Sequence, residues 1–196
     1  RTPSPSPAAA GDGDGVRWLT ADWPADLPDG ARHGWTPAHR RRLASAVAPV
    51  AAQVRAALTV PGGRTLVLGT EELMYTPMRI ADALARRGPG EVRYQSTTRS
   101  PVHPVDVDGY AIRTALTFPA PDDPGRDSHL YNVRPDSYDD IVVVVDEGVD
   151  AAAPAPVADP SGLVARLRPC APVTVLTLPA HRPAPRPATT RPEPSR

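Results

Sequence analysis

Lysine is absent from this chain of 196 residues, so all 22 positions counted as lysine or arginine are arginine. A chain without lysine has no Schiff-base lysine and no P-loop, because both depend on the lysine amine. Cys170 is the single cysteine, which also excludes an intrachain disulfide and a multi-cysteine metal site. We expect Cys170 to be a small buried side chain beside the last strand.

Charge and hydropathy exclude two classes of partner. The formal net charge is zero and the sequence pI is about 7.2, so there is no basic field to attract nucleic acid or an anionic membrane. No apolar run approaches the ~20 residues of a membrane span, and the first residues lack a signal-peptide pattern. We therefore predict a cytoplasmic protein that binds neither nucleic acid nor membranes.

Both ends of the chain have the composition of linkers. Residues 1–15 and 180–196 are rich in proline and alanine and contain almost no large apolar side chain. Such segments bury too little surface to repay the cost of ordering, so we predict a disordered linker, a single domain over 16–179 and a disordered tail. A Pro/Ser-rich start without methionine is typical of an interdomain linker, and we expect a fragment of a longer fusion.

Between these ends, short apolar runs alternate with amphipathic segments. Helices are predicted from Thr36-Pro37 to residue 58, from 70 or 76 to Gly88, and over 163–168. Strands are predicted at 65–69, 91–95, 141–145 and 173–178, and an irregular region over 96–134 holds two more, 110–118 and 130–133. The alternation predicts an α/β fold with a mainly parallel sheet, helices on both faces and a Rossmann-like three-layer arrangement.

Polar residues follow three of the predicted strands directly. They are Thr70-Glu71-Glu72, the turn Gln95-Ser96-Thr97-Thr98-Arg99-Ser100-Pro101, and Asp146-Glu147. Because the carboxyl ends of parallel strands meet at one edge of a sheet, we expect all three groups to line one crevice, where α/β proteins bind ligands.

The turn that contains Arg99 carries most of the chemistry. Hydroxyls and backbone N–H groups in a turn can cradle phosphate oxygens, and a guanidinium matches phosphate bidentately. Carboxylates at the same edge could hold ribose hydroxyls or Mg²⁺. The simpler alternative is that the hydroxyls bond their own backbone, Thr70 caps a helix, and Arg99 pairs with Glu71 or Glu72.

Other candidates have a weaker basis. Tyr75, Tyr131 and Asn132 could stack on and hydrogen-bond a base, although Tyr131 and Asn132 equally suit a strand end and turn. Asp146-Glu147 follows a valine run as in the phosphoribosyl-pyrophosphate motif of phosphoribosyltransferases, but the glycine-rich phosphate loop that should come next is missing. No Ser-His-Asp order is present, so catalytic residues stay unknown.

The segments Leu68–Pro77, Thr98-Arg99-Ser100-Pro101 and Tyr131–Val133 together resemble the TRSP domain, over roughly Trp35 to Leu178. The resemblance implies a bacterial domain that lies C-terminal to, or beside, a phosphoribosyltransferase in gene clusters for tellurite resistance and stress response. It also implies a pathway that makes a nucleoside-like small molecule.

Three function hypotheses follow. The first is a domain that binds a phosphorylated ribosyl or nucleotide-like ligand and works with the transferase, in cis or in trans. The second is a non-catalytic scaffold that docks the transferase, and the third is a Mg²⁺-dependent phosphotransfer or phosphohydrolase enzyme that uses Asp146 and Glu147. An open pocket with Arg99 facing solvent would favour ligand binding, whereas a closed network of Arg99 with carboxylates would favour the scaffold.

Overall fold

The fold is built on one large β-sheet. The computed structural model describes residues 10–11, 15–30, 34–147 and 157–181. Its sheet has the order β1-β2-β8-β7-β3-β4, in which the five strands from β2 to β4 are parallel and β1 is antiparallel to β2. The strands are β1 (Ala10–Gly11), β2 (Val16–Thr20), β3 (Arg64–Gly69), β4 (Glu91–Ser96), β7 (Asp140–Asp146) and β8 (Val173–Leu178). The predicted α/β class with a mainly parallel sheet is confirmed.

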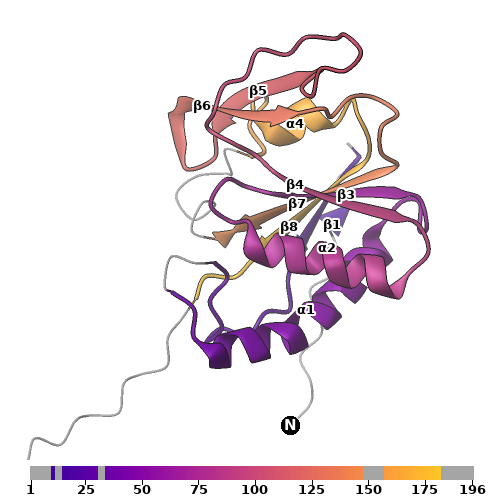
Figure 1. The fold of residues 1–196 in the computed structure, drawn as a ribbon. Coiled ribbons are helices and arrows are strands. Elements are labelled where there is room, and N and C mark those ends of the chain that lie inside the picture. The colour runs from indigo at the N-terminus through magenta and orange to yellow at the C-terminus, as the bar shows by residue number, and fades with distance from the viewer. Residues whose placement is uncertain (1–9, 12–14, 31–33, 148–156, 182–196) are drawn as a thin grey trace, which may run out of the picture.

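The two faces of the sheet are covered differently. Helices α1 (Pro37–Ala57) and α2 (Tyr75–Arg87) lie on one face, as Figure 1 shows. The other face carries the short helix α4 (Leu163–Leu167) and an antiparallel ribbon of β5 (Ala115–Ala120) and β6 (Asp123–Tyr131). The second layer is therefore largely a strand ribbon, and the Rossmann-like description stays a prediction.

Strand β7 is the centre of the core because its side chains are buried on both faces of the sheet. Val142 and Val144 pack into the cluster beneath α1 and α2. Ile141, Val143 and Val145 point the other way, into the cluster with Phe118 of β5 and Leu130 of β6. A strand that is covered on both faces needs a continuous apolar run, which is what the valine run supplies.

Helix α1 begins where the sequence predicts. The Thr36 side chain accepts a hydrogen bond from the His39 backbone, the His39 ring accepts one in return, and Pro37 occupies the first turn. The helix continues through Pro49 to Ala57. Arg55 then donates to the Leu84 carbonyl at 2.7 Å and to the Arg87 carbonyl, so α1 satisfies the free carbonyls at the end of α2.

The connections reverse direction at the centre of the sheet. From β3 the chain passes through α2 to β4 on one side, and from β7 it passes through α4 to β8 on the other. The adjacent strands β3 and β7 therefore form a topological switch point, the place where open α/β sheets bind ligands beyond their carboxyl ends.

Two parts of the sequence-based picture need correction. Strand β2 was not predicted, yet it pairs with β8 along its whole length and extends the sheet. The ribbon runs over 115–131 with a turn at 121–122, where the sequence predicts separate strands at 110–118 and 130–133 around a loop. Pro119 and Pro124 favour a loop, but a two-stranded ribbon leaves each strand one unpaired edge, where proline is tolerated.

Most of the predicted linkers lie outside the described residues. Within the first of them, Ala10–Gly11 pairs with Arg17 and Trp18 of β2. The single domain over 16–179 stays a prediction.

Asp140 offers a test of how the sheet is tied to the loop after α1. Its buried carboxylate accepts hydrogen bonds from the Thr59 and Val60 backbone N–H groups, both at 2.8 Å. Asp140→Ala leaves both donors without a partner, so we expect a loss of about 2–3 kcal/mol in the free energy of unfolding, measured with urea. Asp108→Ala, which removes a fully exposed carboxylate, is the control and should change stability by less than about 0.5 kcal/mol. Equal effects of the two substitutions would contradict this account.

Candidate functional site

The loop after β3 is fixed to the end of β4 at the carboxyl edge of the sheet. Gly69 ends β3, and a Cβ there would collide with the backbone carbonyl of Leu73, so only glycine allows the tight turn that follows. Glu71 adopts a left-handed backbone with φ of 45°, and its N–H donates to the Thr97 hydroxyl at 2.9 Å. The Thr97 N–H donates to the Gly69 carbonyl at 3.0 Å. The two predicted motifs therefore meet in space.

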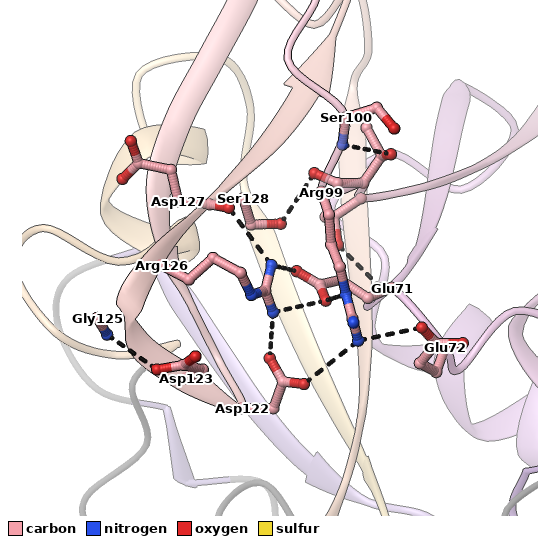
Figure 2. A network of polar contacts seen from close by, with 12 residues as sticks. Glu71, Glu72, Arg99, Ser100, Asp122, Asp123, Gly125, Arg126, Asp127 and Ser128 are labelled. Atoms are coloured by element: carbon pink, nitrogen blue, oxygen red, sulfur yellow. Dashed lines mark hydrogen bonds and ion pairs between the residues drawn. The ribbon is translucent and has the colours of Figure 1, made fainter.

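The buried carboxylate of Glu71 lies between two guanidiniums, as Figure 2 shows. Its side chain is 6% exposed and accepts a hydrogen bond from Arg99 Nε at 2.9 Å. Arg126 of β6 donates to the same carboxylate through Nη1 at 3.0 Å and Nη2 at 2.9 Å, a bidentate contact. These three charge-assisted hydrogen bonds satisfy a carboxylate that would otherwise be costly to bury.

Two more carboxylates complete the network. Glu72 Oε1 lies 3.1 Å from Arg99 Nη2, and Asp122 bridges the two arginines at 2.8 Å from Arg126 Nη2 and 3.7 Å from Arg99 Nη2. The network therefore holds three carboxylates and two guanidiniums. Its net charge is negative, so in this arrangement it does not favour an incoming phosphate.

The protonation of Glu71 follows from these contacts. Burial is the largest single effect on the carboxyl, and it acts to raise the pKa. The hydrogen bonds from Arg126 and Arg99 lower the pKa, and with smaller contributions of the same sign they outweigh the effect of burial. The pKa of Glu71 is therefore held below its ordinary value. The side chain is ionised at neutral pH and acts as a fixed anion.

Arg126 reaches Glu71 because the ribbon is irregular. Pro119 pairs with Asp127, but the next residue of β5, Ala120, pairs with Asp123, so β6 contains extra residues at this point. Arg126 lies in this bulge. Bulges re-aim side chains out of the regular alternation of a strand, and here the result is a cation directed at the end of β3.

The hydroxyl-rich turn is joined to β6 through its backbone. Thr98 exchanges two backbone hydrogen bonds with His129, at 2.9 and 2.8 Å, and its hydroxyl accepts from the Ser100 N–H at 3.2 Å. The Tyr131 hydroxyl donates to the Ser100 carbonyl at 2.6 Å and accepts from the Val102 N–H at 2.8 Å. Several of the polar atoms that the sequence suggests for a phosphate cradle, the Thr98 hydroxyl and the Ser100 N–H among them, are used in these internal bonds.

The remaining aromatic and amide candidates also make structural contacts. Gln95 donates to the Tyr131 carbonyl at 3.0 Å. Asn132, with φ of 57°, accepts from the Arg113 N–H and donates to the Ala111 carbonyl, both at 2.8 Å, which is the turn role left open by the sequence. Tyr75 lies on α2, and its ring packs edge-on against the ring of Trp35, with 5.7 Å between the ring centroids. Its ring contact is therefore with Trp35 and not with Tyr131.

The other strand-end candidates lie at or just after the carboxyl ends of β3, β4 and β7. Ser96 ends β4 opposite Gly69. Thr70 is buried, and its hydroxyl lies 3.5 Å from the Val144 carbonyl of β7, across the switch point. Asp146 is buried at the end of β7, while Glu147 accepts a hydrogen bond from the Ala180 N–H at 2.7 Å. Glu147 is therefore turned toward the segment after β8.

Sequence reasoning missed two members of the network, Arg126 and Asp122. Both come from the ribbon, in a stretch of proline, aspartate and glycine that the sequence indicates as a loop. No motif or spacing in that stretch marks either side chain, because their positions depend on how the ribbon folds back over β4.

A family model described as "TRSP domain C terminus to PRTase_2" matches residues 29–166. The chain belongs to the TRSP domain family. Its name-giving motif, Thr98-Arg99-Ser100-Pro101, is the turn that contacts Glu71 and β6. No curated protein and no solved structure matches the chain.

Among the residues of this TRSP domain that the structure describes, no helix is both long and apolar enough to cross a membrane. In the same residues, no three His, Cys, Asp or Glu side chains are grouped in a way that could hold a metal ion. The magnesium site stays a prediction.

The lowered pKa of Glu71 predicts how stability depends on pH. Its contribution is fully present above the unfolded carboxyl pKa of about 4.3, and it is lost as the pH falls through the lower pKa of the folded state. At neutral pH we expect Glu71→Gln to reduce the free energy of unfolding by roughly 1–3 kcal/mol.

The measurement is urea unfolding of the wild type and this variant across the acidic range, and the gap between them should shrink as the pH falls. Glu72→Gln is the matched control, since that side chain is 68% exposed. A gap that stays constant with pH would show that the charge of Glu71 contributes nothing.

Proposed function

We propose that this TRSP domain is a non-catalytic partner of a phosphoribosyltransferase and docks on the transferase domain, in the same chain or as a separate one. The observation that carries this proposal is the closed network at Glu71, in which Arg99 is used by internal carboxylates. The hydroxyls of Thr97 and Thr98 are likewise bonded to the backbone of this chain. The motif therefore has a structural role, since it joins the loop after β3 to the turn after β4 at the carboxyl edge of the sheet.

The family description supports the choice of partner, since it places the TRSP domain C-terminal to a PRTase_2 domain. For the contact surface, we point to α2. Met74, at its start, is 50% exposed and Met78 is 41% exposed, one turn further along the helix. Methionine is common at binding surfaces because its flexible side chain adapts to different shapes.

A second candidate is the ligand-binding role. It is favoured by the place of the network, at the carboxyl edge beside the β3–β7 switch point, and by the 51% exposure of the Arg99 side chain. A phosphorylated ribosyl or nucleotide-like ligand would have to displace Glu72 and Asp122 from Arg99. Heat on titration with ribose 5-phosphate that disappears in Arg99→Ala would favour this candidate over docking.

Other parts of the sequence-based interpretation stay predictions. They are the Mg²⁺-dependent phosphotransfer or phosphohydrolase activity of Asp146 and Glu147, the pathway linked to tellurite resistance and stress, and the cytoplasmic location. The burial of Asp146 and the contact of Glu147 with Ala180 give the enzyme hypothesis little support.

Docking predicts a complex that depends on α2. When this chain and a PRTase_2-type transferase domain are mixed as separate proteins, we expect them to sediment together in velocity centrifugation. Met78→Glu should weaken the complex roughly tenfold or more, because it places an unpaired charge in an apolar contact.

The control is Val107→Glu, which makes the same kind of change at a valine that is 53% exposed in the loop after β4. It should leave the affinity unchanged. The absence of a complex between two folded partners would contradict the docking proposal, and equal losses in both variants would contradict the choice of α2.

A further inference from the structure

The amino-terminal edge of the sheet carries a cavity, and Asn132 is the one residue of the motifs described above that lines it. It has a volume of about 380 Å³ and lies where β3 and β4 begin and where the chain turns from β6 into β7. Its side chains are polar, and three of them are the arginines Arg64, Arg93 and Arg134. Glu91, Asn132, Ser137 and Tyr138 also line it.

The arrangement of the arginines follows from the sheet. Arg64 and Glu91 are direct neighbours on β3 and β4, and Arg93 lies two residues beyond Glu91 on the same face of β4. Arg134 comes from the turn after β6, which is closed by a hydrogen bond from the Ser137 N–H to its carbonyl at 3.2 Å. The cavity therefore gathers guanidiniums from three separate segments.

Two of the carboxylates near the cavity, Asp139 and Glu91, are already paired with arginines. Asp139 accepts from the Arg64 side chain and backbone, and Glu91 accepts from Arg93 Nε. These ion pairs hold two of the guanidiniums in place while leaving other N–H groups of each without a bond in the described residues. Asp136, in the same turn, adds one more negative charge near Arg64.

Arg134 is the side chain that these contacts do not explain. It is exposed, and among the described residues its guanidinium makes no hydrogen bond or ion pair. The hydroxyls of Ser137 and Tyr138 also lack a partner there. The cavity thus combines unused donors with few unused acceptors, which is the chemistry that recognises an oxyanion.

We infer that this cavity binds the phosphate group of a small phosphorylated molecule, with Arg134 as the principal contact and Arg64 and Arg93 as preorganised supports. A phosphate dianion offers enough acceptor oxygens for several guanidiniums at once. The volume is at the lower end of the range for small-molecule pockets, which fits a sugar phosphate better than a dinucleotide.

The test is calorimetric titration of the 196-residue chain with inorganic phosphate, ribose 5-phosphate and citrate in a low-salt buffer. We expect saturable heat with the two phosphates, weakened roughly tenfold or more by Arg134→Ala, the effect of losing one charge-assisted contact. Because Arg134 is exposed and unpaired, this variant should fold as the wild type does, and circular dichroism checks that it does.

Two control variants locate the site. Arg41→Ala removes an exposed arginine of α1, and Arg99→Ala removes the arginine of the opposite edge; both should leave phosphate binding unchanged. No saturable heat from the folded chain, equal binding by Arg134→Ala, or loss of binding in Arg99→Ala alone would overturn the inference. Binding of citrate without either phosphate would overturn the assignment of the ligand class.

Discussion

The carboxylate of Glu71, held between Arg99 and Arg126, is the interaction on which the carboxyl edge of this domain depends. It joins the loop after β3, the turn after β4 and the bulge of β6, because one carboxylate accepts hydrogen bonds from both Arg99 and Arg126. A buried carboxylate without these partners would be costly, and each arginine would lose its fixed position. The ribbon is thereby held over the end of the sheet.

This interaction also decides how the TRSP motif is interpreted. A turn rich in hydroxyls around an arginine has the composition of a phosphate site, but composition does not say where the donors are directed. In this fold the Arg99 guanidinium and the Thr98 hydroxyl are bonded within the protein, and the network has a surplus of carboxylates. Unused arginine donors also line the cavity at the opposite edge, around Arg134. The carboxyl edge of the sheet therefore suits contacts within the protein, whereas the amino-terminal edge suits an anionic ligand.

The sequence was sufficient to predict those parts of the structure that depend on residues close together in the chain. Thr36-Pro37 marked the start of α1, the valine run marked β7, and the rule that parallel strands end at one edge brought Glu71 and Arg99 together correctly. Prediction from sequence failed for those parts whose position depends on pairing between strands that are far apart in the chain. Strand β2 is short, and it joins the parallel sheet by pairing with β8, more than one hundred residues later. Arg126 reaches the site through a bulge that depends on the register of the ribbon.

The most direct test of the account is a double-mutant cycle between Glu71 and Arg99, measured by urea unfolding at neutral pH with Glu71→Gln, Arg99→Gln and the double variant. If Arg99 is held by Glu71, the two substitutions are not additive, and we expect a coupling energy of about 1 kcal/mol for this pair of a half-exposed guanidinium and a buried carboxylate. A coupling energy below about 0.3 kcal/mol would mean that Arg99 is free of the network. The docking proposal would then lose its main support.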